Sequence, residues 1–216
     1  MKILTENENS FEILKAELES GYPIIVPTDT NYNLCCLPDN YEAIDRVFEF
    51  KIRPKNKPLS IFFDKPLDWR KYGKTPHTNL MNLLTLKFWP GALNIIVDNN
   101  SEFNYAINDS DTIALGCVSN PTFRNFVNYL GRPVAITSAN ISGTADDLLI
   151  TEEVALEHMG GKVNYLLKSS KKGESSKSST IIKVNADGTV SLIREGDLPF
   201  VQIQSAIQEE GLLVEN

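Results

Sequence analysis

Short apolar segments alternate with amphipathic segments along this chain, and this alternation limits the folds open to it. The segments 23–26, 58–63 and 133–137 are apolar runs next to prolines, a pattern typical of buried strands. The segment 78–88 repeats apolar residues three and four positions apart, as an amphipathic helix does. Because the two kinds of segment interleave and some strands are adjacent, we expect an α/β fold with a twisted, mixed, open sheet and flanking helices.

Capping residues set the expected ends of the helices. Asn9 or Ser10 is expected to cap the first helix and Asn40 the second, while Asn120 and Thr151 are expected to cap two later ones. A further helix is expected near 200–210. Additional strands are predicted near 92–97, 112–115, 164–167, 179–184 and 189–193.

Composition bounds the organisation of the chain. The 216 residues are 42% hydrophobic and 23% charged, which is typical of a soluble globular domain. We assign residues 1–197 to one domain and residues 198–216 to a C-terminal tail or short helix, with no further domain. The serine- and lysine-rich segment 168–179 is expected to be a mobile loop.

The apolar runs and the cysteines indicate the compartment. The longest apolar runs are too short to cross a bilayer, and the polar N-terminus lacks the pattern of a secretion signal. Cys35, Cys36 and Cys117 show no paired spacing, which favours reduced thiols. We therefore expect a cytoplasmic protein that has no membrane partner.

Basic residues are concentrated in two segments of a chain whose formal net charge is −7. Residues 51–87 carry nine basic and two acidic side chains, and residues 158–182 carry five lysines and one glutamate. If the fold brings these segments together, they create a positive field for a phosphate-bearing ligand. Solvated surface lysines would give the same counts. A surface for duplex nucleic acid more often gives the whole domain a basic pI.

Several common chemistries lack their signatures. The two histidines, His77 and His158, have no cysteine or histidine at metal-ligand spacing, so we expect no protein metal site. The sequence contains no GxxxxGK[ST] phosphate loop, no GxSxG elbow and no GxGxxG motif. Classical hydrolase, P-loop and Rossmann readings are therefore disfavoured.

Polar side chains follow the ends of several predicted strands. Thr28 and Thr30 come after the strand 23–26, and Ser138 and Asn140 come after the strand 133–137. Open α/β sheets bind ligands at strand ends. Ordinary turns use the same residue types to satisfy their own backbone, so both readings stay open for each segment.

A basic segment, 51–58, carries Lys51, Arg53 and Lys57 between prolines. Prolines disfavour a helix there, and in an extended segment Lys51 and Arg53 would point to the same side. Such a pair can clamp a polyphosphate, with arginine as a bidentate fork and lysine as a point charge. The alternative is an exposed basic loop.

The joint order of these motifs is more specific than any one of them. PTDT, KxRPxxKPL, FWPG, TSAN, SST and REG follow one another between residues 21 and 196. In this order the chain resembles the YrdC-like family, the threonylcarbamoyl-AMP synthases of the single-domain TsaC type. The resemblance implies an α/β fold with a positively charged cavity.

The resemblance also implies an activity. Such an enzyme is a nucleotidyltransferase that condenses L-threonine, bicarbonate and ATP to L-threonylcarbamoyladenylate and releases pyrophosphate. Transferase partners then pass the group to tRNA during threonylcarbamoyladenosine modification. Mg²⁺ would accompany ATP and be held mostly by phosphate oxygens.

The same resemblance assigns roles to individual residues. Lys51 and Arg53 would act in catalysis. Thr28, Thr30 and Ser179 would bind threonine. The residues implied to bind ATP are Lys51, Arg53, Lys57, Ser138, Asn140 and Arg194.

Four positions depart from the family pattern. Asn33 and Asn94 stand where the family usually has glycine and threonine, and Gly116 and Val118 stand where it has arginine and proline. Loss of a charge-assisted contact at Gly116 would cost about 1.5–3 kcal/mol of binding. We therefore expect a divergent member.

Two alternatives stay open at this point. One is a catalytically impaired paralogue that binds nucleotide, tRNA or double-stranded RNA. The other is a carbamoyl-transfer domain of the same fold. A steep salt dependence would separate RNA binding from a small-molecule site.

Overall fold

The computed structural model describes residues 1–54, 56–144, 149–171 and 177–211. Its helices are α1 (Glu8–Glu19), α2 (Tyr41–Lys51), a 3₁₀ turn (Pro66–Asp68), α3 (Trp69–Tyr72), α4 (Thr78–Phe88), α5 (Pro121–Leu130), α6 (Glu152–Met159) and α7 (Phe200–Glu209). Its strands are β1 (Lys2–Leu4), β2 (Ile24–Pro27), β3 (Tyr32–Cys36), β4 (Ser60–Phe62), β5 (Gly73–Lys74), β6 (Leu93–Asn99), β7 (Thr112–Gly116), β8 (Val134–Ser138), β9 (Tyr165–Leu167), β10 (Thr180–Val184) and β11 (Val190–Arg194).

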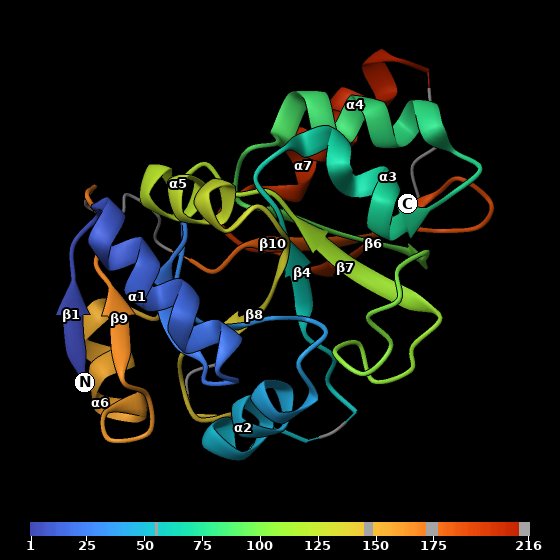
Figure 1. Cartoon of the computed structure of the whole chain (residues 1–216). Helices are drawn as coiled ribbons and strands as arrows, with labels where there is room; N and C mark the ends of the chain where they lie inside the picture. Colours follow the sequence, from blue (N-terminus) through green and yellow to red (C-terminus); the bar gives the residue numbers. More distant parts are fainter. Residues whose placement is uncertain (55, 145–148, 172–176, 212–216) are drawn as a thin grey trace.

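The strands of the described residues form one twisted, mixed sheet, which confirms the predicted fold class. Their order is β1-β9-β2-β3-β8-β4-β7-β6-β10-β11, and β5 pairs with β6. Parallel pairs such as β4–β7 and β6–β10 stand beside antiparallel pairs such as β6–β7 and β3–β8. Figure 1 shows the sheet running through the molecule with helices on both sides.

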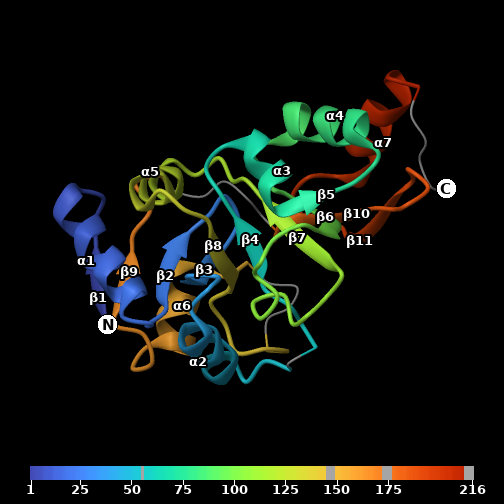
Figure 2. The same ribbon diagram turned by 45° about the vertical axis from the view of Figure 1, so that its right-hand side comes forward.

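Two apolar clusters hold the helices on the sheet. On one face, α1 and α5 pack through residues such as Leu14 and Phe126 against Ile24 and Val134. The other cluster includes residues of α2, α4, α6 and α7. Figures 1 and 2 both place α4 beside α7, and Ile203 of α7 lies in that second cluster. Burying these apolar side chains supplies the main driving force for the fold.

The helix caps show how far local sequence decides this structure. Asn40, Asn120 and Thr151 cap α2, α5 and α6 as predicted, each accepting a hydrogen bond from a backbone N–H of the first turn. The first cap was predicted wrongly, because Asn7, rather than Asn9 or Ser10, accepts from the backbone N–H of Ser10. An earlier polar residue therefore begins the helix two or three residues sooner than predicted.

Several further elements have no counterpart in the predictions. They are the short strands β1 and β5, the strand β3 and the helical turns around Trp69. In β3 the buried side chains include Asn33, which interrupts the apolar pattern. Among the described residues, no helix combines the length and the apolar character needed to cross a membrane.

Candidate ligand-binding site

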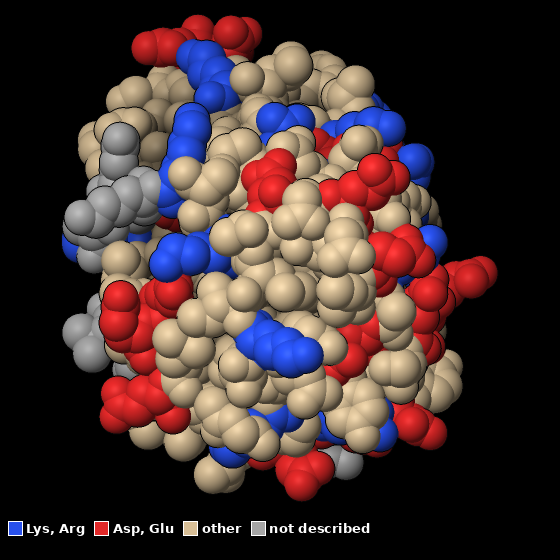
Figure 3. Space-filling model, turned by 60° about the vertical axis from the view of Figure 1, so that its left-hand side comes forward, with Lys and Arg blue, Asp and Glu red and all other residues tan. Residues whose placement is uncertain are grey.

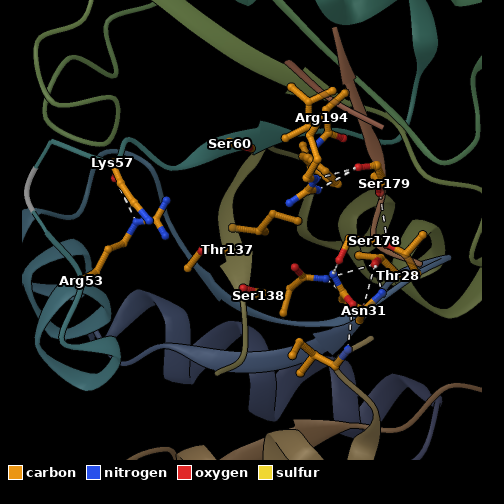
Figure 4. Close-up of a pocket in the computed structure, with 17 residues that line it drawn as sticks. Thr28, Asn31, Arg53, Lys57, Ser60, Thr137, Ser138, Ser178, Ser179 and Arg194 are labelled. Carbon is orange, nitrogen blue, oxygen red and sulfur yellow. Dashed lines mark hydrogen bonds between the residues drawn. The ribbon is translucent and has the colours of Figure 1, made fainter. Parts of the chain in front are cut away.

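A cavity of about 370 Å³ opens on the sheet face that carries α1 and α5, beyond the strands these helices cover. Phe62 marks the border, because it packs in the α1/α5 cluster and also lines the cavity. Figure 4 shows the side chains that line the cavity. The lining comprises Thr28, Thr30, Asn31, Asn33, Arg53, Lys57, Ser60, Phe62, Asn94, Ile136, Thr137, Ser138, Ile150, Ser178, Ser179, Ile181 and Arg194.

The cavity floor is a row of residues that strand register brings opposite one another. Arg194 of β11 faces Ile181 of β10, which faces Asn94 of β6. Asn94 faces Gly116 of β7, and Gly116 faces Phe62 of β4. Opposite residues of neighbouring strands share a face of the sheet, so the row forms one continuous surface.

The turn between β2 and β3 uses Thr28 for its own structure. The Thr28 hydroxyl donates to the Asn31 carbonyl at 2.8 Å and accepts from the Asn31 N–H at 3.2 Å and from Asn33 Nδ2 at 3.0 Å. Asn33 therefore stabilises the turn, at a position where the resemblance implies glycine. The contacts of Thr28 are those of a residue that stabilises its own turn, although its side chain also lines the cavity.

Thr30, Ser179 and Arg194 meet at one end of the cavity. The hydroxyls of Thr30 and Ser179 lie 3.1 Å apart, although the residues are 149 positions apart in the chain. Arg194 donates from Nε at 3.2 Å and from Nη2 at 2.8 Å to the Ser179 carbonyl. Asn31 joins this end to its surroundings by donating to Ser178 Oγ at 3.0 Å and accepting from the Ile150 N–H at 2.8 Å.

Arg53 and Lys57 stand at the opposite rim. Arg53 donates from Nε to the Lys57 carbonyl and from Nη2 to the Pro58 carbonyl, both at 2.9 Å. Figure 4 places these two side chains on one side of the cavity and Arg194 with Ser179 on the other. The cavity therefore has basic side chains on two separated sides.

The prediction of an extended segment that includes Lys51 was wrong. Helix α2 continues through Lys51, and Ile52 caps it in the left-handed conformation with φ of 52°. The Lys51 side chain is 1% exposed and does not line the cavity. Its Nζ donates to the Asn140 carbonyl at 2.6 Å and to the Ser138 carbonyl, so it braces the turn after β8.

The turn after β8 presents Ser138 to the cavity and buries Asn140. Ser138 Oγ donates to Asn140 Oδ1 at 2.6 Å, and Asn140 Nδ2 donates to the Ile141 carbonyl at 3.0 Å. The Ile141 N–H donates to Nδ1 of His158, at the end of α6, at 3.2 Å. This role of His158 was not predicted, since only the tertiary structure brings α6 to the turn.

Phe62 occupies the space next to Gly116, the position where the resemblance implies arginine. A Cβ at Gly116 would lie 2.4 Å from Phe62 Cε1, so the phenylalanine ring occupies the space above the glycine. The ring is 3% exposed and meets Phe123 of α5 in an edge-on contact with centroids 6.2 Å apart. Val118, the neighbouring departure, is buried in the α1/α5 cluster.

The lining residues that sequence reasoning missed include Asn31, Ser60 and Phe62. Alternation along the predicted strand 58–63 would have put Ser60 and Phe62 on the same face. That pattern could not say which face was open. The segment 168–179 falls partly outside the described residues, and the segment 177–179 contributes Ser178 and Ser179 to the lining.

The two basic segments of the sequence do not both reach the cavity within the described residues. Only Arg53 and Lys57 of the first segment line it, and no described lysine of the second does. Lys162 donates to the Phe50 carbonyl at 2.7 Å, and Lys168 pairs with Glu152 at 3.2 Å. Arg194, which lies outside both segments, supplies the third basic side chain.

Burial raises the pKa of several titratable groups near the site. Burial raises the pKa of Asp29 above its ordinary value, although the carboxylate accepts from the Ser119 N–H at 2.8 Å. Burial raises the pKa of the Cys36 and Cys117 thiols to about 12, so they are poor nucleophiles at neutral pH. No cluster of three or more His, Cys, Asp or Glu suited to a metal ion occurs in the described parts of the chain.

Comparison with known proteins identifies relatives of this fold. The family described as Sua5_yciO_yrdC, telomere recombination, matches residues 16–196. A Methanocaldococcus jannaschii protein named putative threonylcarbamoyl-AMP synthase is 32% identical over 198 residues, covering 92% of this chain and 91% of that protein. The Bos taurus threonylcarbamoyl-AMP synthase is 27% identical over 207 residues, covering 92% of this chain and 71% of that protein.

Solved structures share the fold. A variant of P. abyssi Sua5 matches with a TM-score of 0.86 and 25% identity, over 100% of this chain and 62% of that chain. P. abyssi Sua5 complexed with L-threonine matches with a TM-score of 0.85 and 24% identity, over 100% of this chain and 63% of that chain. This chain thus spans less than two thirds of P. abyssi Sua5. Because the family match extends over residues 16–196, the chain belongs to the Sua5/YciO/YrdC family.

Proposed function

We propose that this protein is an L-threonylcarbamoyladenylate synthase, a nucleotidyltransferase that supplies tRNA threonylcarbamoyladenosine modification. It would condense L-threonine, bicarbonate and ATP and release pyrophosphate. The observation that carries the proposal is the cavity, which lies in a fold shared with threonylcarbamoyl-AMP synthases. It has basic side chains on two separate sides and a pair of hydroxyls beside one of them. Transferase partners would take the product to tRNA.

The two ends of the cavity suit different parts of the substrates. Arg53 and Lys57 at one rim would hold ATP phosphates, because charge-assisted bonds from arginine suit phosphate oxygens. Thr30 and Ser179 at the other end would bind threonine. Arg194, anchored on the Ser179 carbonyl, would place a phosphate next to it.

Buried residues of the motif would act by holding the site in shape. Lys51 fixes the carbonyls of Ser138 and Asn140, so that Ser138 faces the nucleotide. Thr28 keeps the β2–β3 turn closed under Thr30. We therefore propose positioning roles for Lys51, Asn140 and Thr28, and direct contacts for Arg53, Lys57 and Ser138.

The chemistry needs little proton transfer from the protein. The amine of threonine combines with bicarbonate to form a carbamate, and water leaves. An oxygen of this carbamate group then attacks the α-phosphorus of ATP, and the bond from that phosphorus to pyrophosphate breaks. Negative charge builds on the α-phosphate and on pyrophosphate, where preorganised cations lower the barrier. ATP would enter as its magnesium complex, with the ion held by phosphate oxygens, since the described lining residues include no carboxylate.

Pyrophosphate release tests the proposal. Release should require both L-threonine and bicarbonate in the presence of ATP and Mg²⁺. The double variant Arg53→Ala and Lys57→Ala should lose most of this activity. Lys65→Ala and Lys74→Ala, at exposed positions of the same basic segment outside the cavity, should keep it. Pyrophosphate release that does not depend on L-threonine would contradict the proposed synthase activity.

The binding of double-stranded RNA finds little support. On the face in Figure 3, acidic side chains are scattered among the basic ones, with uncharged areas between them. Together with the net charge of −7, such a mixture does not favour a duplex, whose affinity comes largely from neutralised phosphates. Electrophoretic mobility at two salt concentrations would reveal such binding.

A further inference from the structure

Asn94 carries a buried side-chain oxygen that has no hydrogen-bond partner in the protein. The residue is 8% exposed, and it lines the cavity. Its Oδ1 accepts no hydrogen bond. Four buried side-chain atoms in the described residues lack a partner, and only that of Asn94 belongs to a cavity-lining residue. Buried polar atoms are nearly always paired, so an unpaired oxygen on a residue of the cavity floor indicates a ligand partner.

The register places Asn94 near the Thr30–Ser179 end of the cavity. Asn94 stands opposite Ile181 of β10, and the preceding pair is Leu93 with Thr180. Ser179, which contacts Thr30, comes directly before that pair. The amide is therefore one strand away from the end proposed for the amino acid.

The surroundings of Asn94 on the floor are uncharged. Its neighbour on one side, Ile181, is apolar, and Gly116 on the other side has no side chain. The Phe62 ring closes the space above Gly116. A charged ligand group would lose its hydration here without gaining an opposite charge, whereas a neutral hydrogen-bonding group would be accommodated.

We propose that Asn94 is a specificity-determining residue that binds the side-chain hydroxyl of the amino acid substrate. This inference rests on the proposed function and names the part of the substrate that the floor recognises. A hydroxyl both donates and accepts, and an amide offers one acceptor and two donors, so the two groups are complementary. L-Valine has the shape of L-threonine but offers a methyl, which would leave the amide unpaired.

Selectivity between these two amino acids tests the inference. The kcat/KM for pyrophosphate release is measured with L-threonine, L-valine and L-serine, for the wild type, Asn94→Leu and Asn94→Val. The wild type should prefer threonine over valine by about a hundredfold or more. Both variants should lower that ratio at least about tenfold, because they cannot pair with the hydroxyl. ATP binding should be unchanged.

A matched control makes the same chemical change elsewhere. Asn128→Leu replaces an exposed asparagine on α5 and should keep both the activity and the threonine preference. Asn94→Val provides a smaller, strand-favouring side chain in case Asn94→Leu does not fold. ATP binding serves as the check that each variant is folded.

The outcomes separate this inference from the proposed function. An unchanged threonine-to-valine ratio in the folded Asn94 variants, with threonine-dependent activity intact, overturns the role of Asn94 alone. A wild type whose pyrophosphate release depends on none of the three amino acids overturns both. A ratio that falls in the Asn94 variants and stays constant in Asn128→Leu supports the inference.

Discussion

The rim and the floor of the cavity are built in opposite ways. At the rim, Arg53 bonds the carbonyls of Lys57 and Pro58, four and five residues away, on an exposed loop. On the floor, Arg194, Asn94 and Phe62 come from strands far apart in the chain and meet through register. Local contacts thus make a charged, adaptable rim, whereas long-range pairing makes a rigid, mostly neutral floor.

The largest difference in stability between a buried and a rim position is expected for Lys51 and Lys57. Lys51→Met should lower the free energy of unfolding by about 3 kcal/mol, because it leaves two carbonyls of the 138–140 turn without their donor. Lys57→Met, at an exposed position, should change it by less than about 0.5 kcal/mol. Urea denaturation measures both. Equal losses of stability would show that the buried lysine and the rim lysine contribute alike to the fold.

The contact between Phe62 and Gly116 tests the rigidity of the floor. Gly116→Ala should cost about 2 kcal/mol of stability, because the new Cβ would overlap the phenylalanine ring. Combining it with Phe62→Leu should recover part of this loss relative to the sum of the single changes. A double-mutant cycle by chemical denaturation gives the coupling. Strict additivity would mean that the ring moves freely.

The rim should tolerate change better, and Arg53→Lys sharpens this contrast. A lysine keeps the charge but lacks the planar fork through which Nε and Nη2 of Arg53 reach the Lys57 and Pro58 carbonyls. We expect ATP affinity to fall roughly fivefold, equivalent to one hydrogen bond of about 1 kcal/mol. Isothermal titration measures the affinity, and Lys74→Arg provides the control outside the cavity. An affinity equal to that of the wild type would show that charge alone matters at the rim.

The smallest expected effect concerns Asp29, which ties the β2–β3 turn to Ser119. Burial raises the pKa of this carboxyl above 3.8, so the folded state binds its proton more tightly than the unfolded state. The stability that this group contributes is therefore lost as pH rises from 3.8 through the raised value. Asp29→Asn should lack this pH dependence when unfolding is followed across that range. The same slope in both proteins would contradict it.

The sequence by itself determined most of the elements and several of the helix ends. Asn40 and Asn120 cap the helices they were predicted to cap, and the apolar runs became buried strands. The motif order also indicated the family, which the match over residues 16–196 confirmed. These features depend on interactions within a few residues, which local propensity and capping chemistry describe well.

Only the tertiary structure decided how the side chains divide between cavity and core. Lys51 and Arg53 are two residues apart, yet a left-handed helix cap at Ile52 buries one and leaves the other at the rim. Asn94, Gly116 and Phe62 became neighbours through strand register, which no spacing in the sequence encodes. The physical reason is that register and side-chain direction are fixed by packing between distant segments, where a shift of one residue would reverse every face.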